Sequence, residues 1–496
     1  MVEALMRDYR ANHSLGSGGR IISQGKCELH LDDTFLVIKG DRSSRIGYEQ
    51  LESFHPIPGG IEVQLFPEGS IRFDGMDGAF VRPLFAHLSH LRGLRWAFLL
   101  RYLDGAPVDT LECKVGLPDL PEQEALVHLY PHGLVGMPYG GEPFRLPVAD
   151  LRSIVRTPDY RLICSTDDLS AALFGCEPTY LGRFQGSVEG ARQKAEEETA
   201  ALLVELFPSL EFSQVDQLTT LLVGGRAAPK QLLDQAVPWL WSRLEELVQT
   251  NAVYPETYSL LRGRARDLMW FGLRRLSDAE ERGDGTSRGD ADLSTQMAGT
   301  TGPEPESEPA AERDFLLWFL AGITEGDERF LVVEVDAGRK GFATYVYRCP
   351  GTKADAEAFD ETASVVSRAM IALNFYREPI YGPQVDIESG RFGEYKLAIR
   401  KLRYLQAARG LFLGRVMHGS SGTWTSGLNA LLAAPAPQGS EAGGLRGDHL
   451  VSAQVGIVEG LIPGRRRVGR DRGHVLGGEV LWRAALGRDL QPGHPP

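Results

Sequence analysis

The sequence lacks an ordered cysteine pattern, a long apolar run and a secretory leader. Its five cysteines are odd in number and scattered, without C-x-x-C pairs or the spacing of a disulfide framework, which favours a reducing compartment. The longest apolar runs, such as 315–323, are well short of the ~20 residues that span a bilayer. The first residues lack the basic end and apolar run of a secretory signal. We therefore expect a cytoplasmic protein.

Positive charge is also scarce. The formal net charge is −13 and the pI is about 5.4, whereas a nucleic-acid-binding surface needs a basic footprint. This balance argues against nucleic acid as a partner. The apolar share of 43% is ordinary for globular protein. At ~150 residues per domain, the length predicts about three domains.

Common catalytic motifs are missing as well. The glycine-rich stretches at 16–19 and 224–226 do not continue into a phosphate-binding G-x-x-x-x-G-K-[ST] loop. Ser420 lies near His418, but the G-x-S-x-G turn of a serine nucleophile is absent. The sequence therefore predicts no catalytic residue, no metal site and no cofactor.

What the sequence does contain is an internal repeat. The stretch 29–53 is nearly repeated at 127–153, and the offset grows only from 98 to 100 residues. The matching segments are Leu29-His30-Leu31 with Val127-His128-Leu129, Leu36-Val37 with Leu134-Val135, Arg45-Ile46 with Arg145-Leu146, and Leu51 and Ser53 with Leu151 and Ser153. One β-rich unit is therefore present twice.

Each copy predicts short strands followed by one helix. Apolar runs separated by turn residues every few positions are typical of antiparallel hairpins. The spacing then changes to three and four residues, which predicts an amphipathic helix. Its apolar positions are Phe80, Val81, Leu84 and Leu88 in the first copy and Tyr180, Leu181, Phe184 and Val188 in the second.

A curled antiparallel sheet of about seven strands closed by one C-terminal helix resembles the pleckstrin-homology-like (PH-like, including GRAM) domain. The resemblance rests on element order and on the repeat. It implies an α+β protein with two PH-like β-barrels and C-terminal capping helices, at 26–100 and 124–208. The polar, glycine-dotted start of the chain predicts a flexible N-terminal arm, 1–25. Such PH-like units bind lipid headgroups, peptides or proteins without catalysis, and the fold alone does not decide which.

The rest of the chain divides at an acidic segment. Periodic apolar residues predict a helical subdomain at 209–277. Hydrophobic residues almost vanish from 278–312, which predicts a disordered acidic linker that splits the protein in two. A second α+β module follows at 313–432, with a predicted hairpin of 330–336 and 342–348.

The tail, 433–496, has no lysine but many arginines, glycines and prolines. One interpretation is a disordered arm. The other is an aberrant tail from a frame change in a GC-rich gene, because GC-rich codons encode arginine, glycine, alanine and proline but not lysine. Both interpretations predict little packing.

Four histidines draw attention. His87 and His90 form an H-x-x-H pair on a predicted helix, but no third metal ligand is near, so we interpret them as a surface pair. His30 and His128 recur at matching places within a predicted first strand, which favours packed or edge histidines.

Two basic clusters are the candidate binding residues for an anion or a partner. Lys39, Arg42 and Arg45 surround a predicted hairpin turn in the first copy, and such clusters grip phosphates in PH-like domains. Asp41 partly neutralises this cluster, so a solvated turn is the alternative.

The second cluster is Lys396, Arg400 and Arg403, which fall on one face of a predicted long helix, 394–413. A solvated helix face is one interpretation. The other is a binding surface for an acidic segment, such as 303–312, or for a nucleic-acid backbone.

Three functions follow from these patterns. The leading hypothesis is a non-enzymatic adaptor that binds protein or peptide partners. The second is binding of anionic lipid through the first copy. The third is an enzyme with its site in residues 313–432, where Glu325, Asp327, Glu334 and Asp336 supply carboxylates. The sequence names neither the partner nor the oligomeric state.

Overall fold

The computed structural model describes residues 8–17, 20–40, 43–103, 105–167, 169–251, 255–276, 315–336, 342–350, 355–382, 387–388, 392–418 and 420–433. All of them belong to one compact unit, 1–435. The predicted linker and the predicted tail beyond residue 433 lie outside the described residues. The fold is α+β, with two seven-stranded antiparallel sheets, a six-stranded sheet and helices.

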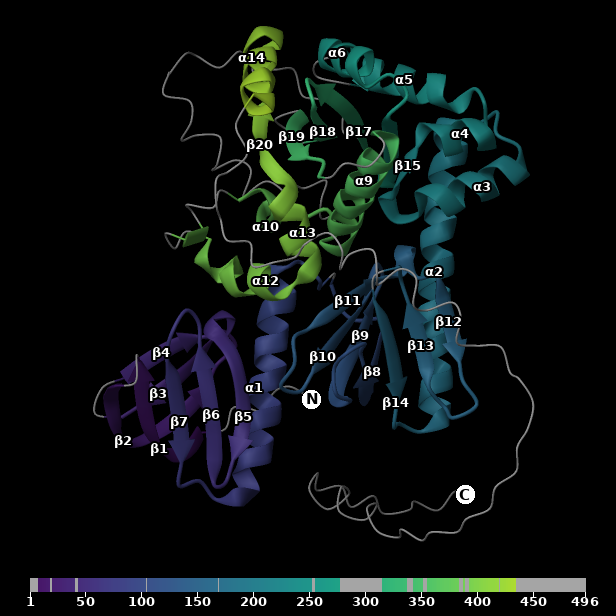
Figure 1. Ribbon diagram of the computed structural model, residues 1–496. Helices are drawn as coiled ribbons and strands as arrows, with labels where there is room; N and C mark the ends of the chain where they lie inside the picture. Colours follow the sequence, from purple (N-terminus) through teal and green to yellow (C-terminus); the bar gives the residue numbers. More distant parts are fainter. Residues whose placement is uncertain are drawn as a thin grey trace, which may run out of the picture. The chain divides into compact units, whose positions relative to one another are not determined.

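The first repeat, 8–99, is a seven-stranded sheet closed by a helix (Figure 1). Its elements are β1 (Asp8–Ser17), β2 (Arg20–Leu31), β3 (Phe35–Lys39), β4 (Ser43–Gly47), β5 (Leu51–Ile57), β6 (Gly60–Leu65), β7 (Ser70–Asp74) and α1 (Gly78–Leu99). The Asp77 carboxylate caps α1 by accepting a hydrogen bond from the Ala79 amide at 3.0 Å. Apolar residues on α1, Leu84 and Leu88, pack on the inner face of the sheet.

The second repeat, 109–206, has the same order of elements. They are β8 (Asp109–Gly116), β9 (Gln123–Tyr130), β10 (Gly133–Pro138), β11 (Phe144–Pro147), β12 (Ser153–Arg156), β13 (Leu162–Ser165), β14 (Ser170–Phe174) and α2 (Pro178–Leu206). The first sheet is ordered β4-β3-β2-β1-β7-β6-β5 and the second β11-β10-β9-β8-β14-β13-β12. The repeat in the sequence is therefore a repeat of topology.

Two details differ from the prediction for the repeats. Among the described residues no strand pairing closes either sheet into a barrel, because each order runs between two edge strands. The predicted flexible arm, 1–25, contains β1 and the start of β2. Only Tyr9 and Ala11 of β1 are buried, and the strand is held by backbone pairing with β2 and β7, which composition does not reveal.

The third sheet is a meander of six strands. They are β15 (Ala227–Pro229), β16 (Met269–Arg275), β17 (Phe315–Glu325), β18 (Glu328–Asp336), β19 (Phe342–Arg348) and β20 (Phe412–Met417), in that order. The predicted pairing of β18 with β19 is confirmed. The helices around the sheet are α3 (Phe212–Leu222), α4 (Lys230–Ala236), α5 (Leu240–Asn251), α6 (Pro255–Ala265), α9 (Asp355–Ala372), α10 (Glu378–Tyr381), α12 (Lys396–Lys401), α13 (Arg403–Leu411) and α14 (Ser421–Leu432).

The protein does not divide at the predicted linker. β16 precedes the linker and pairs with β17, which follows it, from Met269 opposite Ala321 to Arg275 opposite Phe315. The predicted helical subdomain therefore contributes two strands to the same sheet as the predicted second module. The apolar spacing predicts that a helix continues to Leu276. The structure has strand β16 there instead, because pairing with β17, beyond the linker, stabilises the extended backbone.

The predicted long helix 394–413 is also interrupted. Leu402 has an extended backbone (φ −92°, ψ 110°), so α12 ends at Lys401 and α13 begins at Arg403. The end of the predicted helix belongs to β20, where Phe412 pairs with Tyr347 of β19. The three basic residues of the second cluster therefore do not share one continuous helix.

One hydrophobic core joins α1 of the first repeat to the second and third sheets. It contains Trp96 and Ala97 from α1, Val135 from the second repeat, and Trp318 and Leu320 from β17. No described helix has the length and apolar character needed to cross a bilayer. The five cysteines are free thiols.

The pairing of β16 with β17 predicts that the linker backbone is dispensable for folded structure. We expect a chain cut at an engineered protease site at position 295 to elute as one species of unchanged size, because seven backbone-paired residues and the shared core remain. Size-exclusion chromatography under native conditions measures this, with the same cut chain in denaturant as the control. Separation of the two fragments under native conditions would contradict the shared sheet.

Candidate binding surface

Each repeat carries one row of four residues across its sheet. The strand registers align Asp8, His30, Val37 and Arg45 in the first repeat and Thr110, His128, Val135 and Arg145 in the second. Residues directly opposite each other in antiparallel strands point to the same face. The neighbouring positions Leu36 and Ile46 lie in the core, so both rows lie on the outer face, away from the closing helix.

In the second repeat the part of this outer face formed by β10 and β11 is covered by two helices. All residues of β10 and β11 are buried. Helix α1 passes against β10, and a Cβ atom on Gly93 would lie only 3.1 Å from the Met137 side chain. Helix α9 contacts β11 at its C-terminal end (Figure 1). The outer face of the second sheet is therefore a helix-binding surface within the chain.

Arg145 holds the end of α9. Its Nη1 donates to the Ile371 carbonyl at 2.6 Å and to the Ala372 carbonyl at 2.8 Å, while Nη2 donates to the His132 carbonyl at 3.1 Å. The last carbonyls of a helix lack intrahelical partners and carry partial negative charge. The buried Arg145 guanidinium gives these carbonyls hydrogen-bond donors and places a positive charge beside their partial negative charge. Phe375 completes the helix end by donating its amide to Met370 at 2.7 Å.

The corresponding row of the first repeat is exposed at its two ends, Asp8 and Arg45, whereas Val37 within it is buried. Arg45 projects from an exposed position, and His30 is half-buried with its Nδ1 at 2.8 Å from Asp8. Where Met137 faces Leu126 in the second repeat, Lys39 faces Glu28 in the first. The same fold therefore presents a packed face in one copy and a charged face in the other.

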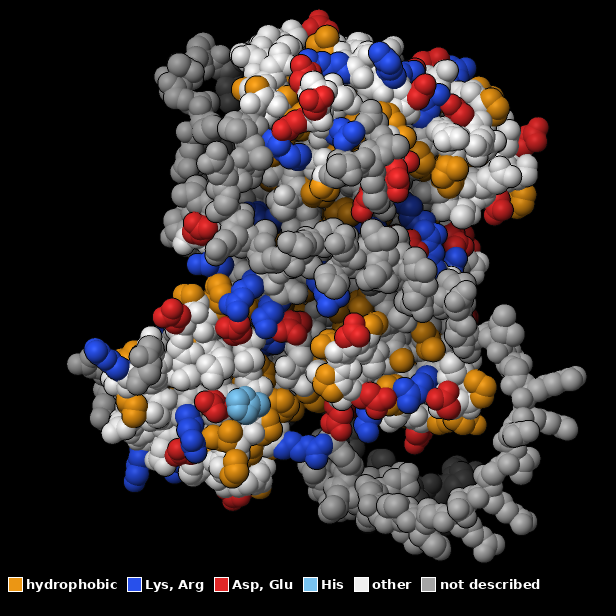
Figure 2. All heavy atoms as spheres, in the orientation of Figure 1, with side chains coloured by type: hydrophobic (Ala, Val, Ile, Leu, Met, Phe, Trp, Pro, Cys, Tyr) orange, Lys and Arg blue, Asp and Glu red, His pale blue; other side chains and the backbone are white. Residues whose placement is uncertain are grey.

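The first predicted cluster consists of Lys39, Arg42 and Arg45. Lys39 and Arg45 lie on the same outer face, and Arg42 lies outside the described residues. Acidic side chains share the face, since Glu28 is opposite Lys39 and Arg10 lies 3.9 Å from Glu28. Figure 2 likewise shows basic and acidic side chains interspersed over the visible surface. The described part of the cluster is thus a mixed-charge surface.

The second predicted cluster contacts other parts of the chain. Arg400 forms an ion pair with Glu52 of the first repeat at 3.1 Å. Both Lys396 and Arg400 lie over the Phe66 ring, 5.5 and 5.4 Å from its centre. Arg403, beyond the break at Leu402, is exposed. Two of the three predicted residues therefore bind an acidic and aromatic surface within the protein.

Arg92 lies at the centre of this junction. Its guanidinium donates to the carbonyls of Leu51 at 2.8 Å, Glu52 at 2.9 Å and Gly141 at 3.1 Å, and it lies 4.8 Å from the Trp96 ring centre. Burial lowers the pKa of Arg92 to about 10, and the Glu142 and Glu52 carboxylates oppose that shift. Arg92 is therefore still charged at neutral pH. Sequence reasoning missed it, because its acceptors are backbone atoms.

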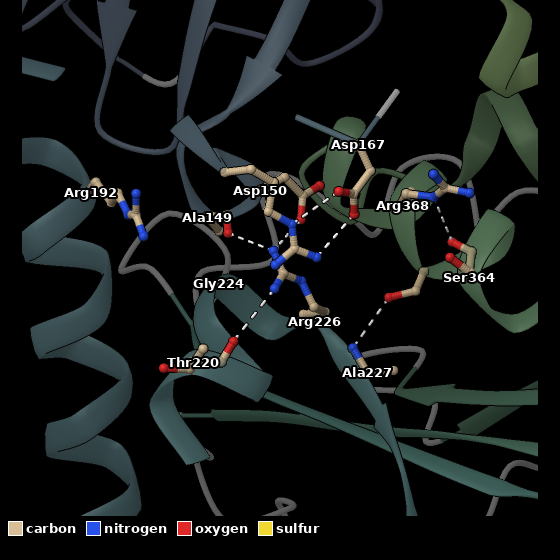
Figure 3. A network of polar contacts seen from close by, with 12 residues as sticks. Ala149, Asp150, Asp167, Arg192, Thr220, Gly224, Arg226, Ala227, Ser364 and Arg368 are labelled. Carbon is tan, nitrogen blue, oxygen red and sulfur yellow. Dashed lines mark hydrogen bonds and ion pairs between the residues drawn. The ribbon is translucent and has the colours of Figure 1, made fainter. Parts of the chain in front are cut away.

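A further arginine joins the second repeat to the third sheet (Figure 3). Arg226 donates to the Ala149 carbonyl and to the Asp150 carboxylate, each at 2.7 Å. Beside them, Arg152 binds Asp167 through two hydrogen bonds of 3.1 and 3.0 Å. This hydrogen bonding lowers the pKa of Asp167 despite its partial burial.

The carboxylates of the enzyme hypothesis do not gather. Glu325 of β17 is paired with Glu328 at the start of β18. Glu334 lies six residues farther along β18, which is about 20 Å at the rise of a β-strand. Glu334 and His418 are buried, with side chains 2% exposed and 3.0 Å between Oε2 and Nε2. The Trp424 indole donates to Thr344 Oγ1 at 2.7 Å, and that hydroxyl donates to Glu334. This arrangement anchors α14 on the sheet.

A surface groove of about 970 Å³ lies between α5, α6 and α14. Its walls carry Ser259, Ser421, Thr425 and Asn429, with one carboxylate, Glu256. The described residues contain no cluster of three or more histidine, cysteine, aspartate or glutamate side chains suited to a metal ion. The groove is therefore lined mostly by uncharged residues.

The histidine prediction for α1 needs correction. His87 is buried and His90 is half-buried, because α1 packs between its own sheet and the second repeat. His90 faces His128 of β9, whose Nδ1 lies 2.9 Å from the Thr110 hydroxyl. Burial, and secondarily His90, lowers the pKa of His128 to about 4, and burial lowers the pKa of His90.

Comparison with protein-family models and with curated proteins finds no match to this chain.

The Arg92 geometry predicts a large loss of stability on truncation. Arg92→Met removes one cation and leaves three carbonyl acceptors at the junction, so we expect a loss of roughly 3 kcal/mol in the free energy of unfolding. Denaturant unfolding measures it. Arg10→Met, at a side chain 91% exposed, is the control and should change stability by less than about 0.5 kcal/mol. Equal effects of both substitutions would refute the role of Arg92.

The lowered pKa of His128 predicts sensitivity to acid. Unfolded histidine takes up its proton near pH 6.5, whereas folded His128 does so near pH 4, so stability present above pH 6.5 is lost between pH 6.5 and 4. After discounting for partial exposure, we expect a loss on the order of 1–2 kcal/mol. His128→Gln should flatten the curve of unfolding free energy against pH, and the exposed His55→Gln should not. Parallel curves for wild type and His128→Gln would contradict this assignment.

Proposed function

We propose that this protein is a non-enzymatic cytoplasmic adaptor that binds a protein or peptide partner through tandem PH-like units. Two seven-stranded antiparallel sheets of identical strand order, each followed by one helix, support the PH-like assignment. The fold class is associated with binding of peptides, proteins or lipid headgroups, so the choice among these depends on the surfaces.

One observation carries the choice of a protein partner. The outer face of the second sheet already binds two helices of its own chain, α1 along β10 and the end of α9 at Arg145. This surface is thus built for polypeptide. The first repeat has a matching row, in which Arg45 takes the position of Arg145 and is exposed.

The character of the exposed copy suits a reversible partner. Permanent interfaces are apolar, like the packed pair Met137 and Leu126, whereas exchangeable interfaces resemble the ordinary polar surface. Lys39 and Glu28 at the matching positions keep the first repeat compatible with solvent when no partner is bound. Binding of anionic lipid is less well supported, because Glu28 and Asp8 would repel phosphate on the same face.

Partner capture tests the proposal against the lipid alternative. Immobilised full-length protein is expected to retain a specific protein from a lysate of its own source at physiological salt, and to leave phosphatidylserine-rich vesicles unbound. The double variant Lys39→Glu, Arg45→Glu should lose the captured protein, because its face becomes acidic. Arg72→Glu, at an exposed position on β7, is the matched control. Vesicle binding without protein capture would overturn the proposal.

A further inference from the structure

The two outer-face rows differ in one decisive respect, which is occupancy. In the second repeat, Val135 is buried and its neighbour Arg145 binds the C-terminal carbonyls of α9. In the first repeat, Val37 is also buried and is paired with His30 on one side and Arg45 on the other, in the same register, so the rows differ at the arginine. No described residue forms an ion pair with Arg45, and its side chain is exposed.

We propose that this row binds the C-terminal end of an α-helix presented by a partner protein, with Arg45 donating to the terminal carbonyls. The inference rests on the proposed adaptor function and names the element that the adaptor recognises. Arg45 occupies the place from which Arg145 reaches the Ile371 and Ala372 carbonyls.

The positive charge of the Arg45 guanidinium favours the C-terminal end of a helix over its N-terminal end. The terminal carbonyls carry about half a negative charge, so a guanidinium attracts a helix C-terminus and repels an N-terminus. Arginine also supplies several donors in a fixed plane, which allows it to bridge two successive carbonyls. Lysine at the same place would form a less directional contact. The side-chain chemistry therefore selects both the element and its polarity.

The surroundings limit the strength of the interaction. Met137 packs against α1 in the second repeat, whereas Lys39 lies opposite Glu28 at the equivalent position in the first. A helix bound there gains mainly polar contacts, because Val37 is already buried. We therefore expect a partner helix with polar side chains near its end, bound reversibly and more weakly at high salt.

A defined helical peptide tests the proposal without knowledge of the partner. The probe is a fluorescent peptide with the sequence of residues 355–372, held helical by a side-chain cross-link and ending in an amide, so that backbone carbonyls rather than a carboxylate are presented. Fluorescence anisotropy with the full-length chain measures binding. The Arg45→Met variant is expected to bind about tenfold more weakly, because a charged donor to two carbonyls is lost.

Matched controls separate the row from general charge effects. Arg72→Met removes an exposed arginine from β7 of the same sheet and should leave binding unchanged. The same peptide with Val365→Pro loses its helix and should not bind. Both results, together with the loss in Arg45→Met, support the proposal.

Other outcomes overturn it. Absence of peptide binding to the wild-type chain, or equal binding by Arg45→Met, means that the row does not recognise helix ends. A wild-type dimer that Arg45→Met dissociates would make a second copy the occupant, which also overturns a partner protein as stated. A captured partner that is insensitive to Arg45→Met refutes this inference alone, whereas failure to capture any protein refutes the adaptor function.

Discussion

Guanidinium groups placed against backbone carbonyls hold the sheets of this protein together. Arg92 joins the first repeat to the second, Arg145 joins the second repeat to α9, and Arg226 joins the same repeat to the residues before β15. Carbonyls at the ends of elements need donors when they are buried. Arginine supplies several donors and keeps its charge in a partly apolar setting. The shared core depends on these contacts, because they satisfy the polar groups at its edges.

Duplication gave the chain two copies of one sheet, and their outer faces have diverged. Gly93 of α1 allows a close approach to Met137 of the second repeat, and strand β10 is buried. In the first repeat, Lys39 and Glu28 keep the equivalent face in water. A difference of a few side chains thus separates an internal interface from an external binding surface.

The third sheet is a support for these repeats. Glu334 and His418, which look catalytic by type, are enclosed beneath α14 with Thr344 and Trp424. Glu334 and His418 are hydrogen-bonded to each other, and their side chains are 2% exposed. The basic residues Lys396 and Arg400 likewise contact the first repeat. Residue types that suggest chemistry in isolation are used here to join parts of the chain.

The sequence alone determined the repeat, the strand-then-helix order and the β18–β19 pairing, because these follow from local periodicity and from self-similarity. It also identified Lys39 and Arg45 as exposed candidates. It missed β1, and it assigned β16 to a helix, because a strand is stabilised by its partner and β16's partner lies beyond the linker. Only the tertiary structure showed that Arg145 is buried while Arg45 is exposed. Two similar segments differ in that way because burial is decided by what packs on them, and α1 and α9 cover the outer face of one copy alone.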